Sequence, residues 1–150
     1  MNKRKLKFAK ALMKKKLDIF PLKENAKVPV ATGWQTEGVN DVKKWANGLD
    51  LNIGVICGML TAGWQMLVVD IDMKHGVDGE AAWKALGIEE SLFQVKTPTG
   101  GRHLYYIVPV GISLGNSAGK IAEGVDIRCN GGYVVGPGST IDGVEYEVIN

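Results

Sequence analysis

Two aspartates at the end of an apolar run are the first residues whose spacing could support chemistry. The run Leu67–Asp72 reads Leu-Val-Val-Asp-Ile-Asp, which is typical of a buried β-strand. Because side chains alternate along a strand, Asp70 and Asp72 would share the face opposite to Leu67 and Val69. Two like charges placed in this way repel each other unless a proton or a cation lies between them. The pair therefore predicts either a divalent metal site or a strand that ends on two hydrated acids.

Two later segments also place polar residues where a predicted strand meets a glycine-rich turn. Thr97–His103 reads Thr-Pro-Thr-Gly-Gly-Arg-His, and its consecutive glycines can leave backbone N–H groups facing an anion, beside two cationic side chains. Val125–Arg128 reads Val-Asp-Ile-Arg, so its acid and its arginine share one face of a strand. With the first pair of acids, these residues form an inventory that suits a metal-bound polyphosphate.

The pattern of apolar and turn residues indicates the elements that must position these side chains. We expect strands at 19–22, 52–58, 67–72, 93–96, 102–108, 125–128, 133–135 and 144–148. We expect helices at 3–17, at 40–45 (ended by Asn47-Gly48) and at 80–86 (ended by Gly87). Residues 61–63, 97–101 and 130–132 are expected turns, and 111–124 is an expected loop. Strands joined by short turns, with few helices, predict an α+β fold with a mostly antiparallel sheet.

The first predicted helix is strongly basic. Residues 3–16 include eight lysines and arginines, and no acid occurs before Asp18. A block of like charge is most often a solvated helix face, but it could also contact nucleic-acid phosphates. The sequence leaves both interpretations open.

Composition limits the remaining possibilities. A chain of 150 residues with 45% hydrophobic and 23% charged residues is expected to form one globular domain. Cys57 and Cys129 are far apart and, with His75, lack zinc-ligand spacing, so they are interpreted as structural thiols in a reducing compartment. The four tryptophans are scattered and are interpreted as core or turn anchors. The sequence has no P-loop motif and no apolar run long enough to predict a membrane span.

Three ordered blocks carry a family resemblance. VVDID, TPTGGRHLYY and GVDIRCNGGYVVGPGS, preceded by FPLKENAKVPVATGWQ and NIGVICG, resemble the N-terminal catalytic domain of bifunctional DNA primase/polymerases, in the archaeo-eukaryotic primase superfamily. The resemblance covers residues 19–148. This chain departs from the family at Cys129, where glycine is frequent, and at Gly138, where proline is frequent.

The resemblance implies an RRM-like sheet with a smaller packed α/β unit. It implies one catalytic domain over 1–150, with a basic helix at 1–17 and a core at 18–150. Asp70, Asp72 and Asp126 would be the catalytic acids that hold two divalent ions, Mg²⁺ or Mn²⁺, about 4 Å apart. His103 would contact the phosphates of the incoming nucleotide. Further nucleotide-binding candidates are Lys27, Lys96, Thr99, Gly100, Gly101, Arg102 and Arg128.

The implied activity is metal-dependent, template-directed nucleotidyl transfer from dNTPs or NTPs. The implied partners are a single-stranded DNA template, a primer and a helicase or helical domain in the same or another chain, with no membrane. The implied setting is the cytoplasm of a prokaryote, in plasmid or phage replication, and the chain would be either a fragment or a small stand-alone protein. Two alternatives stay open: a non-catalytic RRM-like nucleic-acid-binding module, and a metal-dependent nuclease or phosphoesterase.

Overall fold

The structure is a computed structural model that describes residues 3–34, 38, 45, 49–111 and 117–150. The helix predicted at 40–45 lies outside these residues except for Trp45, which is buried in the core. Within the described ranges, no helix is both long and apolar enough to cross a lipid bilayer.

The larger of the two main sheets has seven strands, and every strand pairing in it is antiparallel. Its strands, in spatial order, are β12 (Glu147–Val148), β5 (Phe93–Lys96), β6 (Arg102–Val108), β4 (Gln65–Ile71), β8 (Val125–Arg128) and β7 (Ser117–Ala122), with β3 (Gly58–Met59) also paired to β4. The prediction of an α+β fold with a mostly antiparallel sheet is therefore confirmed.

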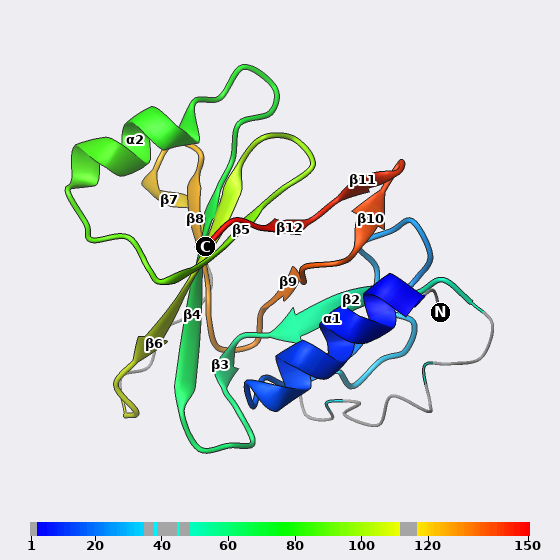
Figure 1. The fold of residues 1–150 in the computed structure, drawn as a ribbon. Coiled ribbons are helices and arrows are strands. Elements are labelled where there is room, and N and C mark those ends of the chain that lie inside the picture. Colours follow the sequence, from blue (N-terminus) through cyan, green and yellow to red (C-terminus); the bar gives the residue numbers. More distant parts are fainter. Residues whose placement is uncertain (1–2, 35–37, 39–44, 46–48, 112–116) are drawn as a thin grey trace.

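A smaller three-stranded sheet packs beside the large one. It contains β1 (Ile19–Leu22), β2 (Asn52–Ile56) and β9 (Tyr133–Val135), and the hairpin of β10 (Thr140–Ile141) and β11 (Val144–Glu145) follows it in the chain. Helix α1 (Lys3–Lys14) lies along this sheet, and helix α2 (Gly79–Leu86) covers the large sheet at the other end of the molecule (Figure 1).

The two faces of β4 belong to two different cores. Leu67, Val69 and Ile71 pack with Trp83 of α2 in one buried cluster. Val68 belongs to the larger cluster, which joins the large sheet to the small sheet and to α1. The alternation predicted from the sequence is thus confirmed for this strand, and the acids lie on the face toward the small sheet.

The chain crosses between the two sheets at two adjacent places and returns to the large sheet once more at Tyr146, between β11 and β12. The first of the adjacent crossings is at Cys57, between β2 and β3, and the second is the segment from Cys129 to Gly132, between β8 and β9. The Cys57 N–H donates a hydrogen bond of 3.0 Å to the Gly132 carbonyl, which ties the crossings together. Both cysteines are buried free thiols, and burial raises the pKa of the Cys57 thiol well above its usual range.

Several element boundaries differ from the sequence-based expectations. The first helix ends at Lys14, because Lys16 adopts a left-handed conformation with φ of 66°. The expected strand 144–148 is divided between β11 and β12, which pair with different partners. The expected loop 111–124 contains β7, an edge strand with a register irregularity against β8, and that part of the prediction was wrong.

A substitution at Gly101 would test how tightly the turn before β6 packs against the end of β4. A Cβ atom at this position would lie 2.1 Å from the Ile71 carbonyl oxygen, which is far inside van der Waals contact. We expect Gly101→Ala to lower the free energy of unfolding by about 1–3 kcal/mol, as overpacking does elsewhere. Urea denaturation would measure the change. Thr99→Ala, in the same turn, is the control and should change stability by less than ~0.5 kcal/mol; equal effects would contradict this account of Gly101.

Candidate functional site

Three neighbouring strands bring three polar residues into one row. In the register of the sheet, Asp70 on β4 lies directly opposite His103 on β6 and directly opposite Asp126 on β8. Residues that are directly opposite in adjacent strands point to the same face of a sheet. The strand pairing therefore gathers residues that are far apart in the sequence on the face toward the small sheet.

This row forms part of the lining of a cavity of about 470 Å³. The large sheet and its turns contribute Asp70, Ile71, Asp72, Lys74, Thr97, Pro98, Thr99, His103, Asp126 and Arg128. The small sheet and the segments near it contribute Lys27, Tyr133, Val134, Val135, Ile141 and Tyr146. The cavity thus combines carboxylates, cations and hydroxyl groups in one space between the two sheets.

The pKa of Asp70 is lowered by the residues around it. Its Oδ1 lies 3.4 Å from the Nε2 of His103, and the Nδ1 of His103 is buried without a hydrogen-bond partner among the described residues. Burial alone would raise the pKa of Asp70, but the hydrogen bond and charge of His103, with the charges of Arg128 and Lys74, outweigh it and lower the pKa. Asp70 is therefore a carboxylate at neutral pH.

The other two acids are each held by a different partner. Asp126 Oδ2 lies 3.6 Å from an Nη atom of Arg128, and Asp72 Oδ1 accepts a 3.0 Å hydrogen bond from the Lys74 N–H. With the side chains in these positions, no group of three or more His, Cys, Asp or Glu within the described ranges could hold a metal ion. The predicted three-acid metal site therefore stays a prediction.

The donor chemistry of the opposed acids nevertheless suits a divalent cation. Asp70 and Asp126 lie directly opposite each other on the adjacent strands β4 and β8, and like charges in such positions repel. Both side chains are partly exposed, at 29% and 24%, so their oxygens are accessible from the cavity. Hard divalent cations prefer carboxylate oxygens of this kind.

The glycine turn differs from the expectation in one respect. The Gly100 N–H donates to the Thr97 carbonyl at 3.0 Å, and the Gly101 N–H donates to Thr97 Oγ1 at 3.1 Å. Because these amides are used within the turn, the prediction that they face an anion was wrong. Gly100 instead supplies a left-handed conformation, with φ of 89°, and Gly101 permits close approach to Ile71. The turn presents side chains to the cavity, including that of Thr99.

The remaining nucleotide-binding candidates divide into two groups. Lys27 and Arg128 line the cavity, whereas Lys96 and Arg102 do not. Arg102 lies opposite Ile71, on the face of the sheet that α2 covers. Because side chains alternate along β6, Arg102 points away from the face that carries His103. The prediction that Arg102 binds the nucleotide was therefore wrong.

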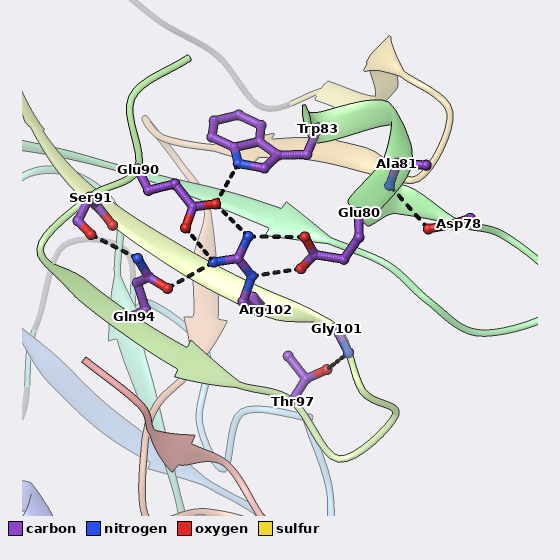
Figure 2. Close-up of polar contacts among 10 residues, drawn as sticks. All are labelled: Asp78, Glu80, Ala81, Trp83, Glu90, Ser91, Gln94, Thr97, Gly101 and Arg102. Atoms are coloured by element: carbon purple, nitrogen blue, oxygen red, sulfur yellow. Dashed lines mark hydrogen bonds and ion pairs between the residues drawn. The ribbon is translucent and has the colours of Figure 1, made fainter. Parts of the chain in front are cut away.

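Arg102 is the centre of an ion-pair cluster that fastens α2 and the following loop to the sheet (Figure 2). Its guanidinium donates to both carboxylate oxygens of Glu80, on α2, and to both oxygens of Glu90, at distances of 2.6–2.9 Å. Gln94 Oε1 accepts a further bond of 2.8 Å, and the Trp83 Nε1–H donates to Glu90. These contacts make Arg102 a structural residue.

Three polar residues of the cavity were missed by the sequence reasoning. Tyr146 lines the cavity with its ring centroid 5.9 Å from that of His103. Burial, with the charge of Asp70, raises the pKa of Tyr146 to about 12, so it is a neutral hydroxyl at physiological pH. Lys74 and Tyr133 also line the cavity. Lys74 could have been inferred from its position two residues after Asp72, but no sequence signal marked the two tyrosines.

The Arg102 cluster has a measurable pH dependence. The hydrogen bonds from Arg102 lower the pKa of Glu90 to about 2, from an ordinary value of 4.5. A depressed pKa in the folded state stabilises the fold above pH 4.5, and this contribution is lost as the pH falls toward 2. We expect wild type to lose its stability advantage over Glu90→Gln between pH 4.5 and 2, as measured by urea denaturation. A difference that does not change over this range would contradict the assignment.

Comparison with known families agrees with this arrangement. The family model described as "bifunctional DNA primase/polymerase, N-terminal" matches residues 9–150, which include every residue of the cavity. A search of the curated proteins finds no match. Since the family model covers nearly the whole chain, this chain belongs to the bifunctional DNA primase/polymerase N-terminal domain family.

Proposed function

We propose that the chain catalyses metal-dependent, template-directed nucleotidyl transfer from dNTPs or NTPs to a primer or to an initiating nucleotide. The observation that carries this proposal is the row of Asp126, Asp70 and His103, which places opposed carboxylates and an imidazole side by side in one cavity. Family membership supports the general class of activity. Plasmid or phage replication and a helicase partner remain predictions.

The acids are proposed to hold the divalent ion. Asp70, Asp126 and Asp72, which line the same cavity, would hold Mg²⁺ or Mn²⁺. When bound, the metal would neutralise phosphate charge and lower the pKa of the attacking hydroxyl. The lowered pKa of Asp70 keeps this ligand ionised and ready for a cation.

The cationic side chains are proposed to hold the triphosphate. Arg128 reaches the cavity from β8 and Lys27 from the loop after β1, so they can contact different phosphate oxygens. The Nε2 of His103 lies 3.4 Å from Asp70 Oδ1, and once Asp70 binds the metal this nitrogen would donate to a phosphate oxygen in place of the carboxylate. In the reaction, a 3′-hydroxyl oxygen forms a bond to the α-phosphorus, the bond to the β-phosphate oxygen breaks, and pyrophosphate leaves.

Removal of the central acid tests the proposal. We expect Asp70→Asn to reduce extension of a labelled primer on a single-stranded template by at least about a hundredfold, because a transition-state stabilising charge is lost. Asp142→Asn is a matched control, since Asp142 is exposed and accepts its bond from Asn25 through Oδ1, which an amide keeps. Circular dichroism and thermal unfolding would verify the fold of both variants. Full extension activity of Asp70→Asn would contradict the proposed function.

One observation favours a second candidate function. Because no three His, Cys, Asp or Glu side chains of the described residues are placed so that they could hold a metal ion together, a non-catalytic nucleic-acid-binding module is also compatible with the cavity. Titration calorimetry with a dNTP separates the two functions. We expect dNTP affinity to rise at least tenfold in Mg²⁺ or Mn²⁺ compared with chelator, which is about 1.4 kcal/mol. A binding module would hold an oligonucleotide in chelator and show no such metal dependence, and strand shortening without added nucleotide would indicate a nuclease.

A further inference from the structure

The exposed face of α1 carries a stripe of lysines. Lys3, Lys7, Lys10 and Lys14 recur at intervals of three or four residues, so they lie on one side of the helix, and all four are exposed. The opposite side of α1 is buried through Lys5, Ala9 and Leu12. At a rise of 1.5 Å per residue, the stripe is roughly 16 Å long.

The stripe concentrates positive charge in a chain that is otherwise acidic. Residues 3–16 contain eight of the 18 lysines and arginines and none of the 16 acids. The rest of the chain therefore has ten basic and 16 acidic residues, a formal charge of −6. A charge separation of this size marks a surface for a polyanion, even though the net charge of +2 does not.

Contacts inside the protein involve other basic residues of this region but not the stripe. In α1, Arg4 Nη2 lies 2.9 Å from Glu145 Oε2 and buried Lys5 lies 3.1 Å from Asp50. Just after the helix, Lys15 Nζ lies 5.0 Å from the centroid of the Phe93 ring. The stripe lysines have no ion pair among the described residues. Lysines at i,i+4 repel each other, and cations in the first turn oppose the helix dipole, so the stripe itself destabilises the helix.

The fold places this helix next to one wall of the cavity. Arg4 anchors the start of α1 to Glu145, the residue before Tyr146, which lines the cavity. Phe8 packs against Gly138, in the segment that leads from β9 to β10, where a Cβ atom would meet its ring at 2.6 Å. The helix is thus fixed to the part of the chain that borders the proposed reaction site (Figure 1).

We propose that the lysine stripe of α1 binds the phosphate backbone of the single-stranded nucleic acid where it extends beyond the cavity. This inference rests on the proposed function for the identity of the strand. The exposed residues of α1 are lysines, Ala11 and Arg4, and the Arg4 guanidinium is paired with Glu145. They include no aromatic ring for stacking and no amide side chain for reading base edges. The contact is therefore electrostatic and independent of sequence.

Salt-dependent binding tests the inference without any catalysis. The probe is a fluorescein-labelled twenty-nucleotide oligo-dT, measured by anisotropy in chelator, without nucleotide, from 50 to 200 mM KCl. Each phosphate neutralised on a single strand contributes a slope of about −0.7 to log K against log[salt], so replacing all four stripe lysines with glutamine should flatten the slope by about 3. Over this salt range the flattening corresponds to roughly fifty-fold in relative affinity.

Matched variants separate a specific contact from net charge. Lys7→Gln/Lys10→Gln and Lys23→Gln/Lys84→Gln remove the same charge from exposed lysines, and only the first pair should flatten the slope, by about 1.4. Equal slopes for the two double variants, or an unchanged slope in the fourfold variant, would overturn the inference. Tighter binding of a duplex of the same length would overturn the assignment to a single strand. The oligonucleotide measurement needs neither metal nor nucleotide, whereas the primer-extension test of Asp70→Asn needs both, so the proposed catalysis and the α1 contact can fail independently.

Discussion

The register of β4 between its two neighbours is the constraint on which the site depends. Asp70 meets His103 on one side and Asp126 on the other only while both ladders keep their present alignment. A slip of one residue in either ladder would turn the acids toward α2 and bury them in an apolar cluster. The apolar residues of β4 that pack under α2 oppose such a slip, so the core on one face maintains the chemistry on the other.

The large sheet also separates two groups of charges with different roles. Arg102 and His103 are adjacent in β6, yet one joins the ion-pair cluster behind the sheet and the other lies beside the acids in front. The rear cluster satisfies its carboxylates completely through bidentate contacts with arginine. The front acids lie farther from their partners, with Asp70 at 3.4 Å from His103 and Asp126 at 3.6 Å from Arg128.

Sequence reasoning succeeded where one local signal decides the structure. Strict alternation identified the faces of β4, and Gly87 marked the end of α2 through its left-handed conformation. It failed for β7, whose Ser, Ala, Gly and Lys residues have low strand propensity and which is held at the sheet edge by β8.

For the site, the sequence identified the acids, His103, Thr99 and the cations Lys27 and Arg128, which do line one cavity. It could not show that Gly100 and Gly101 use their amides within the turn, because hydrogen-bond partners depend on how the turn closes. It also missed Tyr146, whose place in the cavity follows from the division of the last segment between two sheets. Non-local pairing therefore accounts for most of what the sequence did not predict.

The double crossing at Cys57 and at Cys129–Gly132 has a consequence for how the cavity admits a substrate. The backbone is hydrogen-bonded at these crossings, and Gly58 leaves no room for even a methyl group beside Asn130. A third connection, at Tyr146 between β11 and β12, is also bonded, because its N–H donates to the Ser139 carbonyl at 2.8 Å. Moving one wall of the cavity away from the other would break these backbone hydrogen bonds. Side chains along the rim can change rotamer without that cost, so they are the part of the cavity that can adjust most easily to a bound molecule.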